Sequence, residues 1–340
     1  MKKVSRRYFN TALAAGLLGS FYFDKFQKVL AAQTSTRNVP VGIYSIDDAS
    51  LLSKDYVDGV LVRAGWAQCE STQGKYNFAS ITNAITQATK YNKKVTIALL
   101  TFKSPSWLTN DPSIETINGM NGKVPAPWDT KALGLFTKLI SALANTTVGG
   151  YKISQHPNVA NINTTILGVD SIRLVNPPAN YSASKFQTAI LNSMAAWRSN
   201  FPARTGQYYY VGLFAISGST GITDTQNMRD AILAKYPDTN FYQELLTGAS
   251  PSGALFNMLD QVKSKTGIMF QWCGAVSQQN QWTQCYWSKD SNGVNNDTPG
   301  KGFSHGYYDL SAKYFECYAV DLKNAAYTSD YTTWHKTIHS

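Results

Sequence analysis

Two carboxylic acids in the chain are placed where they could transfer protons. Asp170 follows an apolar run in the middle of the chain, and Glu316 lies among the aromatic residues of the segment 314–318. A carboxyl group buried in apolar surroundings loses the solvation of its charged form, so its pKa rises toward the range of a general acid. We therefore predict Asp170 and Glu316 as an acid–base pair. The alternative for Glu316 is a structural ion pair with Arg63 or Arg173.

A second group of side chains could hold a ring-shaped, hydroxyl-rich ligand such as a sugar. Flat aromatic faces stack on the C–H faces of a sugar ring, while its hydroxyl groups need amide or charged partners. Tryptophans and glutamines are interleaved in the segment 271–287, and other candidates follow earlier predicted strands. The same aromatic residues would instead pack in the core if they are buried. The predicted binding residues are Trp66, Arg173, Asn176, Gln271, Trp272, Trp282 and Trp287.

The elements that must position these residues alternate short β-rich runs with longer helical runs. This order is typical of a parallel sheet built from strand–helix units. Amphipathic periodicity predicts helices over 80–91, 129–143, 182–197 and 253–265. The predicted strands are 41–45, 59–65, 94–101, 165–170, 208–217, 267–273 and 313–320, and the position of an eighth strand is open.

Seven or eight such units in about 300 residues favour a closed (β/α)8 TIM-type barrel. We expect it to form one domain over residues 38–340. An open, doubly wound sheet is the alternative, but no GxGxxG fingerprint follows an early strand. In a barrel the active site lies at the carboxyl ends of the strands, which is where Asp170 and Glu316 are expected to meet.

Residues 1–32 have the layout of a bacterial export signal, in which a basic stretch precedes an apolar stretch over residues 11–23. The adjacent Arg6 and Arg7, with Phe9 two positions on, resemble the twin-arginine motif. That motif is read by a receptor that exports folded proteins. The sequence therefore predicts a periplasmic or secreted protein, with the twin-arginine export machinery as a partner.

Half of the formal net charge of +10 comes from this predicted signal. It holds six of the 31 basic and one of the 21 acidic residues, which leaves 25 basic and 20 acidic groups. No run of Lys or Arg follows the signal, so nucleic-acid binding is not expected, because phosphate contacts need clustered cations. No later apolar stretch approaches the ~20 residues that a membrane-spanning helix needs, so no transmembrane segment is expected in the mature chain.

The four cysteines leave their pairing open. An exported protein can form disulfides, and Cys273 with Cys285 is the simplest pair, while buried free thiols are the alternative for any of the four, Cys69 and Cys317 included. No CxxC spacing occurs and no histidine lies at ligand spacing from a cysteine, so a structural zinc site is not expected. No metal and no cofactor is predicted.

One part of the chain resembles a known enzyme family. Trp66, Glu70, Gly74, Tyr76 and Phe78, followed by Pro105-Ser106-Trp107-Leu108, are similar to clan A glycoside hydrolases, in particular to their microbial β-galactosidase branch. The resemblance implies a (β/α)8 barrel with two catalytic glutamates, one in an Asn-Glu pair at the end of the fourth strand and one at the end of the seventh. It gives Glu70 no part in bond cleavage, so we expect Glu70 to fix its loop by accepting backbone hydrogen bonds.

The sequence departs from the family pattern at both catalytic positions. Asn176, near the end of the predicted fourth strand, precedes Pro177, and Gln271 stands where the late strand would carry a glutamate. Two functions remain open. The first is an exported glycoside hydrolase-like protein that cleaves an oligo- or polysaccharide with Asp170 and Glu316. The second is a non-catalytic carbohydrate-binding or cell-envelope pseudoenzyme that keeps the barrel groove.

Overall fold

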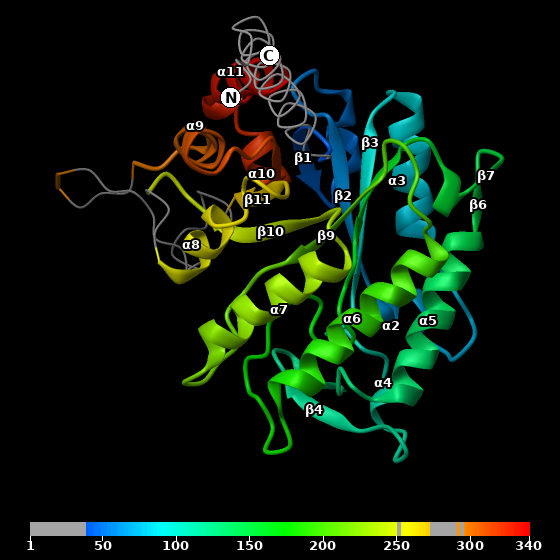
Figure 1. Cartoon of the computed structure of the whole chain (residues 1–340). Helices are drawn as coiled ribbons and strands as arrows, with labels where there is room; N and C mark the ends of the chain where they lie inside the picture. Colours follow the sequence, from blue (N-terminus) through cyan, green and yellow to red (C-terminus); the bar gives the residue numbers. More distant parts are fainter. Residues whose placement is uncertain (1–38, 250–252, 273–290, 293–295) are drawn as a thin grey trace, which may run out of the picture. The chain divides into compact units, whose positions relative to one another are not determined.

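Parallel strands whose side chains alternate between two faces close into a barrel (Figure 1). The computed structural model describes residues 39–249, 253–272, 291–292 and 296–340. In that part of the chain eight strands pair in the order β1-β2-β3-β8-β9-β10-β11-β12, and β12 returns to β1. Helices lie on the outside of these strands. The predicted (β/α)8 barrel is confirmed, and the predicted signal lies outside the described residues.

The elements have the following bounds. The barrel strands are β1 (Gly42–Ile46), β2 (Gly59–Gly65), β3 (Lys94–Leu100), β8 (Val159–Asn163), β9 (Tyr208–Gly212), β10 (Thr239–Leu246), β11 (Ile268–Trp272) and β12 (Tyr314–Tyr318). Two hairpins are formed by β4 (Thr116–Gly119) with β5 (Gly122–Pro125) and by β6 (Thr147–Val148) with β7 (Tyr151–Lys152). The longer helices are α3 (Ala79–Lys90), α5 (Thr130–Asn145), α6 (Ala183–Asn200), α7 (Gly221–Lys235), α8 (Ala254–Asp260) and α11 (Thr328–His339). The short helical turns are η1 (Ala49–Ser53), α2 (Trp66–Cys69), α4 (Ser106–Thr109), η2 (Ile153–Gln155), α9 (Pro299–Ser304), η4 (His305–Asp309), α10 (Ala319–Leu322) and η5 (Ala325–Tyr327).

The middle of the barrel differs from the prediction. The fourth barrel strand is β8, which precedes the predicted segment 165–170. That segment is not a strand, because Gly168 and Asp170 have φ angles of 79° and 60°, which break an extended backbone. The strand whose position was open is β10, the sixth around the barrel. It carries several polar residues, so its sequence lacks the apolar character of a buried strand.

The helix starts agree better with the sequence. Asp129 caps α5 by accepting a hydrogen bond from the N–H of Ala132 at 2.7 Å. Ser182 caps α6 in the same way with the N–H of Lys185, at 3.3 Å. Such caps satisfy N–H groups that have no partner within the helix. Among the described residues, the structure holds no helix of the length and apolarity needed to cross a membrane.

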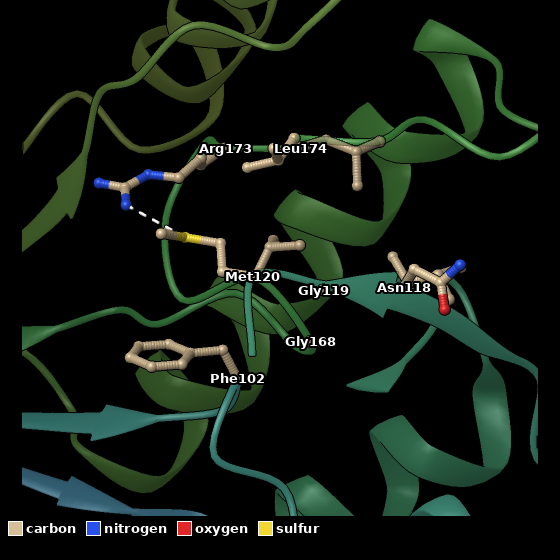
Figure 2. A pocket seen from close by; sticks show the side chains of 10 residues that line it. Phe102, Asn118, Gly119, Met120, Gly168, Arg173 and Leu174 are labelled. Atoms are coloured by element: carbon tan, nitrogen blue, oxygen red, sulfur yellow. Dashed lines mark hydrogen bonds between the residues drawn. The ribbon is translucent and has the colours of Figure 1, made fainter. Parts of the chain in front are cut away.

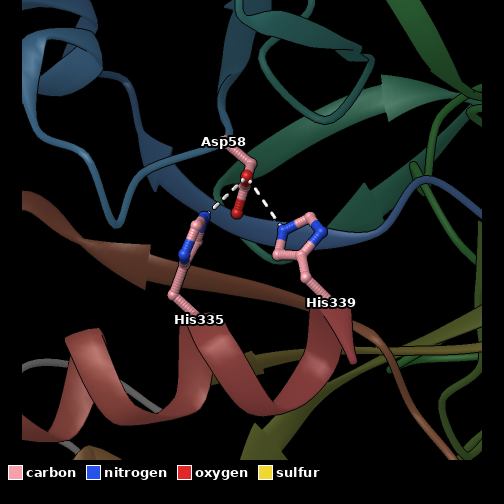
Figure 3. A group of neighbouring side chains, drawn as sticks. All are labelled: Asp58, His335 and His339. Atoms are coloured by element: carbon pink, nitrogen blue, oxygen red, sulfur yellow. Dashed lines mark hydrogen bonds and ion pairs between the residues drawn. The ribbon is translucent and has the colours of Figure 1, made fainter.

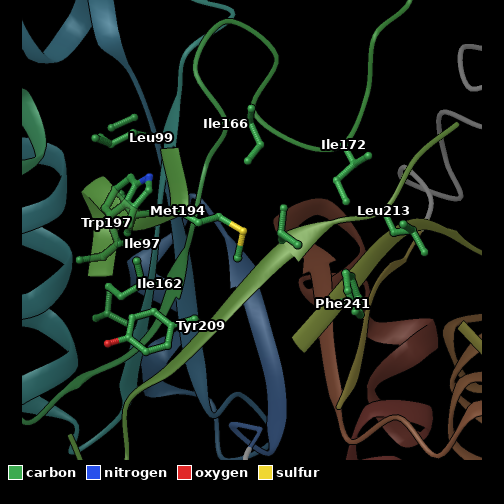
Figure 4. Close-up of a cluster of buried hydrophobic side chains, with 14 of the residues drawn as sticks. Ile97, Leu99, Ile162, Ile166, Ile172, Met194, Trp197, Tyr209, Leu213 and Phe241 are labelled. Carbon is green, nitrogen blue, oxygen red and sulfur yellow. The ribbon is translucent and has the colours of Figure 1, made fainter. Parts of the chain in front are cut away.

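The apolar core lies between the outer face of the barrel and the surrounding helices. Figure 4 shows Ile97, Ile162 and Phe241 on the barrel wall, in one buried cluster with Met194 and Trp197 of α6. Alternate residues of each strand point outward into this layer, because successive side chains of a strand lie on opposite faces. The remaining residues of each strand point into the barrel.

The inside of the barrel is aromatic and polar. Tyr44, Tyr210, Tyr242 and Tyr314 form a buried cluster with Met269, and the rings of Tyr44 and Tyr314 lie 4.4 Å apart. The hydroxyl of Tyr314 also lies 2.8 Å from the Thr96 hydroxyl, within hydrogen-bond distance. Buried hydroxyl groups need hydrogen-bond partners. The interior of the barrel is therefore filled by packed aromatic rings and polar groups.

One buried carboxylate holds the turn that follows β2. Glu70 accepts the indole N–H of Trp66 on Oε2 at 2.8 Å and the backbone N–H of Gly74 on Oε1 at 2.7 Å. The indole of Trp107 donates to the Glu70 carbonyl oxygen at 2.9 Å. Glu70 is only 2% exposed. The expected role of Glu70 in fixing this loop is confirmed.

We expect Glu70→Ala to lower the free energy of unfolding by about 3 kcal/mol, because the buried indole N–H of Trp66 and the backbone N–H of Gly74 lose a charged acceptor. Glu115 offers a matched control, since it accepts the indole N–H of Trp128 at 2.9 Å but lies exposed to solvent. Glu115→Ala should cost less than about 1 kcal/mol. Urea denaturation measures both losses, and equal losses would contradict the role of the buried carboxylate.

Candidate functional site

Polar side chains from five strands converge on a small cavity at the carboxyl end of the barrel. The cavity measures about 30 Å³, which is room for about two water molecules and less than a sugar ring needs. In a parallel barrel this end is where the functional site is built. The polar residues that line it are Arg63, Asn163, Asp170, Ser171, Tyr210, Tyr242, Glu244 and Gln271.

Asp170 is held in the cavity by the loop that follows β8. Its backbone N–H donates to the carbonyl oxygen of Ile166 at 2.9 Å and lies 3.2 Å from the Thr101 hydroxyl oxygen. Ser171 donates its hydroxyl to Asp170 Oδ1 at 2.9 Å. Burial raises the pKa of Asp170 to about 7, against the lowering effect of the nearby Arg173 charge. At neutral pH this carboxyl group is therefore poised to give up or take a proton.

Beside Asp170, an ion pair joins the loop to β10. Arg173 Nη2 lies 3.0 Å from Glu244 Oε2, and the guanidinium group stacks over the Phe214 ring at 3.6 Å from its centroid. Stacking and pairing together fix the orientation of the arginine. The negative charge of Glu244 is one of the causes that raise the pKa of Asp170. A carboxyl group with a raised pKa, Asp170, thus shares one cavity with Glu244, whose carboxyl group is ion-paired to Arg173.

The rim of the site is apolar. Figure 2 shows Phe102, Met120 and Leu174 around a pocket of about 20 Å³ next to Arg173, whose Nη1 lies 3.4 Å from the Met120 sulfur. Met120 sits in the turn between β4 and β5 and is 55% exposed. At Gly168 any side chain would collide with the carbonyl oxygen of Pro125, so glycine lets the loop close against the hairpin.

Glu316 lies inside the barrel and is not among the residues that line the cavity. It is fully buried, and its Oε1 accepts the hydroxyl of Tyr314 at 2.7 Å. Burial raises the pKa of Glu316 to about 8, while the hydrogen bond from the Tyr314 hydroxyl and the charge of Arg63 oppose the shift. The hydroxyl of Tyr242 donates a hydrogen bond to Gln271 Oε1 at 2.8 Å. A neutral Glu316 fits these surroundings, because within the described residues its Oε2 has no hydrogen-bond partner.

The alternative of an arginine partner for Glu316 is not observed. Arg63 binds Asp47 instead, with its Nη2 2.8 Å from Asp47 Oδ2, and Arg173 binds Glu244. Among the ion pairs of the described residues, none includes Glu316. Glu316 is therefore a carboxyl group with a raised pKa rather than a structural ion pair.

The structure does not support a stacking role for two of the predicted tryptophans. Trp66 is fully buried against Trp107 and Phe136, and Trp272 is fully buried with its indole N–H 3.1 Å from Asp321 Oδ2. Trp66, at the start of α2, and Trp272, at the end of β11, both lie in the core cluster, so neither offers a ring face to a ligand. Gln271 and Arg173 do lie at the site, while Asn176 is exposed on the loop beyond it. The predicted binding residues Trp282 and Trp287 lie outside the described residues.

Sequence reasoning missed Glu244, because the strand that carries it was not placed. The signal was present as alternation in β10, where Phe241 faces the core and Tyr242 faces the lumen. Continuing that alternation by two residues puts Glu244 on the lumen side at the strand end. Since the whole chain holds only four glutamates, Glu244 could have been tested against this pattern.

Two of the four cysteines are free. Cys69 and Cys317 are buried thiols, which confirms for this pair the alternative to disulfide bonding. Burial raises the pKa of both thiols, so neither is a reactive thiolate. Cys273 and Cys285 lie outside the described residues, and their pairing stays a prediction.

Comparison with known proteins adds two similar structures. No family model matches the chain, and no curated protein matches it in sequence. Xylanase B from Clostridium stercorarium F9 is 11% identical, with a TM-score of 0.49, over 82% of this chain and 85% of that chain. Native xylanase 10B from Thermotoga maritima is 12% identical, with a TM-score of 0.48, over 83% of each chain. The barrel assignment rests on the strand pairing of this chain itself.

We expect the stability of the protein to fall as the pH rises from about 5 to 8. Asp170 and Glu316 have pKa values of about 7 and about 8 when folded, against about 4 for an unfolded carboxyl group. The folded state therefore holds protons that the unfolded state has released. Each such group lowers the free energy of unfolding by at most about 1.4 kcal/mol per pH unit in this window.

Glu316→Gln tests this dependence, because glutamine keeps the acceptor for Tyr314 but does not titrate. The variant should lose much of the decline in stability between pH 5 and 8. Glu115→Gln is the control, since hydrogen bonds from Asn180 and Trp128 lower the pKa of Glu115 and its titration falls below this window. Urea denaturation across the pH range measures the slopes. A slope in Glu316→Gln equal to that of the unaltered protein would refute the raised pKa.

Proposed function

We propose that the chain is a glycoside hydrolase-like protein that binds an oligo- or polysaccharide at the carboxyl end of its barrel and hydrolyses a glycosidic bond. One observation carries the proposal. Asp170, with a pKa of about 7, shares a cavity with Glu244, which is ion-paired to Arg173. Acid–base hydrolysis of a glycoside needs one protonated and one ionised carboxyl group. The resemblance of residues 59–108 to the clan A β-galactosidase branch points to the same substrate class.

This proposal revises the acid–base pair inferred from the sequence. Glu244 takes the place given to Glu316, because Glu244 lines the cavity and Glu316 does not. Glu316 becomes a buried neighbour whose protonation responds to the charge of Glu244.

In the proposed reaction Asp170 donates its proton to the glycosidic oxygen while the bond from that oxygen to the anomeric carbon breaks. The carboxylate of Glu244, paired with Arg173, stabilises the positive charge that develops on the sugar and accepts a proton from the attacking water. Arg173 is a positioning residue, because it fixes the Glu244 carboxylate through Oε2. Asp170 then regains a proton from solvent, and Glu244 releases one, so the proton count is restored.

The sugar ring itself would lie over the rim, because the cavity of about 30 Å³ admits only water. Its glycosidic oxygen would then reach the mouth of the cavity, where Asp170 and Glu244 are partly exposed. The rim offers exposed apolar surface at Met120 and Val175, which are 55% and 40% exposed beside Phe102. Apolar surface next to charged groups suits a sugar ring with one C–H face and polar edges. We propose this rim as the binding surface.

A second candidate function is carbohydrate binding without cleavage. Gln271 favours it, because an amide at the end of β11 can neither attack an anomeric carbon nor donate a catalytic proton. Its Oε1 is already engaged by Tyr242. This pseudoenzyme would bind glycans and release no product.

A glycan-array screen of the purified protein, followed by counting of new reducing ends for each ligand found, separates these functions. We expect turnover that falls above pH 7, as Asp170 loses its proton. Asp170→Asn and Glu244→Gln should each lower kcat/KM by about 100-fold or more, because each removes a proton-transfer or charge-stabilising group. Glu115→Gln, at an exposed site, should leave kcat/KM unchanged. Binding without product would favour the pseudoenzyme, and absence of any glycan binding would overturn both functions.

We further propose that residues 1–32 direct the folded protein through the twin-arginine machinery to the periplasm or beyond. Free, buried Cys69 and Cys317 support export in a folded state, because these two thiols need no oxidation after transport. The double variant Arg6→Lys and Arg7→Lys keeps the charge but loses the motif. We expect it to remain in the cytoplasmic fraction, whereas Lys2→Arg with Lys3→Arg should be exported. Export of both variants, measured by cell fractionation, would refute this route.

A further inference from the structure

Three side chains with metal-binding groups meet at the amino-terminal end of the barrel, away from the site described above. Asp58 immediately precedes β2, and His335 and His339 lie on the last helix, α11. Figure 3 shows both imidazole rings reaching from one face of the helix toward the carboxylate. One ligand atom from each of the three residues lies within 4.8 Å of the others. The fold thus brings together residues almost 280 positions apart.

The spacing of these atoms suits a small divalent cation. The Nε2 atoms of His335 and His339 each lie 3.1 Å from Asp58 Oδ1. Two ligand atoms bound about 2.1 Å from a tetrahedral zinc ion lie about 3.4 Å apart, so each observed edge is close to that of a zinc site. The two histidines are four residues apart on a helix, which places both rings on one side.

The carboxylate is held in place by a neighbouring strand. Asp58 Oδ2 accepts the backbone N–H of Ile43 at 2.9 Å, which leaves Oδ1 toward the histidines. Hydrogen bonds of this kind to the second oxygen orient a metal ligand and raise its affinity. The side chains of Asp58, His335 and His339 are 16%, 27% and 40% exposed, so the cluster is shielded on one side and open to solvent on the other.

We propose that Asp58, His335 and His339 bind one divalent transition-metal ion, with zinc as the best match, and that water completes the coordination. Two imidazoles and one carboxylate favour zinc and similar ions over magnesium or calcium, which prefer oxygen ligands alone. The bound ion joins α11 to the start of β2, and through Asp58 to β1. It therefore links the first strands of the barrel to the last helix of the chain. The sequence prediction of no metal site considered only cysteine spacing and histidines near it.

Without a metal, the same three residues form a hydrogen-bonded cluster in which each imidazole donates its Nε2 proton to Asp58 Oδ1. Metal binding has a different consequence, because the ion replaces those protons and links the ligands directly. Calorimetry with Zn²⁺ and visible absorption with Co²⁺ distinguish the two states. The protein is first treated with a chelator and then freed of the chelator.

We expect one equivalent of Zn²⁺ to bind, and the Co²⁺ complex to show the absorption of a four-coordinate site. Asp58→Asn and His339→Gln should each weaken Zn²⁺ binding by at least ~10-fold. His305→Gln is the matched control, because His305 also pairs with a carboxylate four residues away, Asp309, but lies outside the cluster. Its Zn²⁺ affinity should equal that of the unaltered protein.

Thermal unfolding provides a second readout that does not depend on activity. Zn²⁺ at about 100-fold above its Kd should raise the melting temperature by about 5 °C in the unaltered protein and in His305→Gln, but not in His339→Gln. His339 is exposed near the end of α11, so its replacement leaves the core intact. Absence of binding, or binding that survives in both Asp58→Asn and His339→Gln, would overturn the proposed site.

Discussion

The structure depends on polar side chains that pack and form hydrogen bonds with one another inside a closed barrel. Parallel barrels are usually filled by branched apolar residues, but here tyrosines occupy the interior. One of them, Tyr314, donates a hydrogen bond to Glu316. A buried polar group without a partner costs about 1–3 kcal/mol. The positions of the strands are therefore constrained by hydrogen bonds as well as by packing. Thr96 on β3 and Tyr314 on β12 meet across the lumen for this reason.

The same interior sets the electrostatics of the site. The charge of Glu244 raises the pKa of both Asp170 and Glu316. Each of these groups also has one arginine that lowers its pKa, which is Arg173 for Asp170 and Arg63 for Glu316. Glu244 is thus a charge that influences the pKa of both carboxyl groups, Asp170 on the lining of the cavity and Glu316 inside the barrel.

The sequence predicted what depends on local chemistry and missed what depends on long-range placement. Barrel closure, the starts of the helices α5 and α6 near residues 129 and 182, and the role of Glu70 were predicted from the sequence, and the structure confirms them. Glu244 was missed because β10 was not placed, since the polar residues of that strand hide the apolar character expected of a buried strand. Trp66 and Trp272 were assigned to a ligand because residue type alone does not say whether a ring faces the core or the solvent. That choice depends on how the strand ends and the turns after them pack in the whole barrel.

The two ends of the barrel have different roles. The strands β1 and β12, whose pairing closes the barrel, run from one end to the other. β1 pairs with β12 from Gly42 with Tyr314 up to Ile46 with Tyr318. Near the amino-terminal end of this pair, the backbone N–H of Ile43 donates a hydrogen bond to Asp58. Glu316 lies farther along, opposite Tyr44. A metal ion at the amino-terminal end would therefore help to hold β1 in register with β12, the strand that carries Tyr314 and Glu316, without any group of its own in the cavity. Residues at the amino-terminal end of a barrel serve stability, while the loops at the carboxyl-terminal end serve chemistry. Metal ligands at the amino-terminal end therefore leave the candidate site undisturbed.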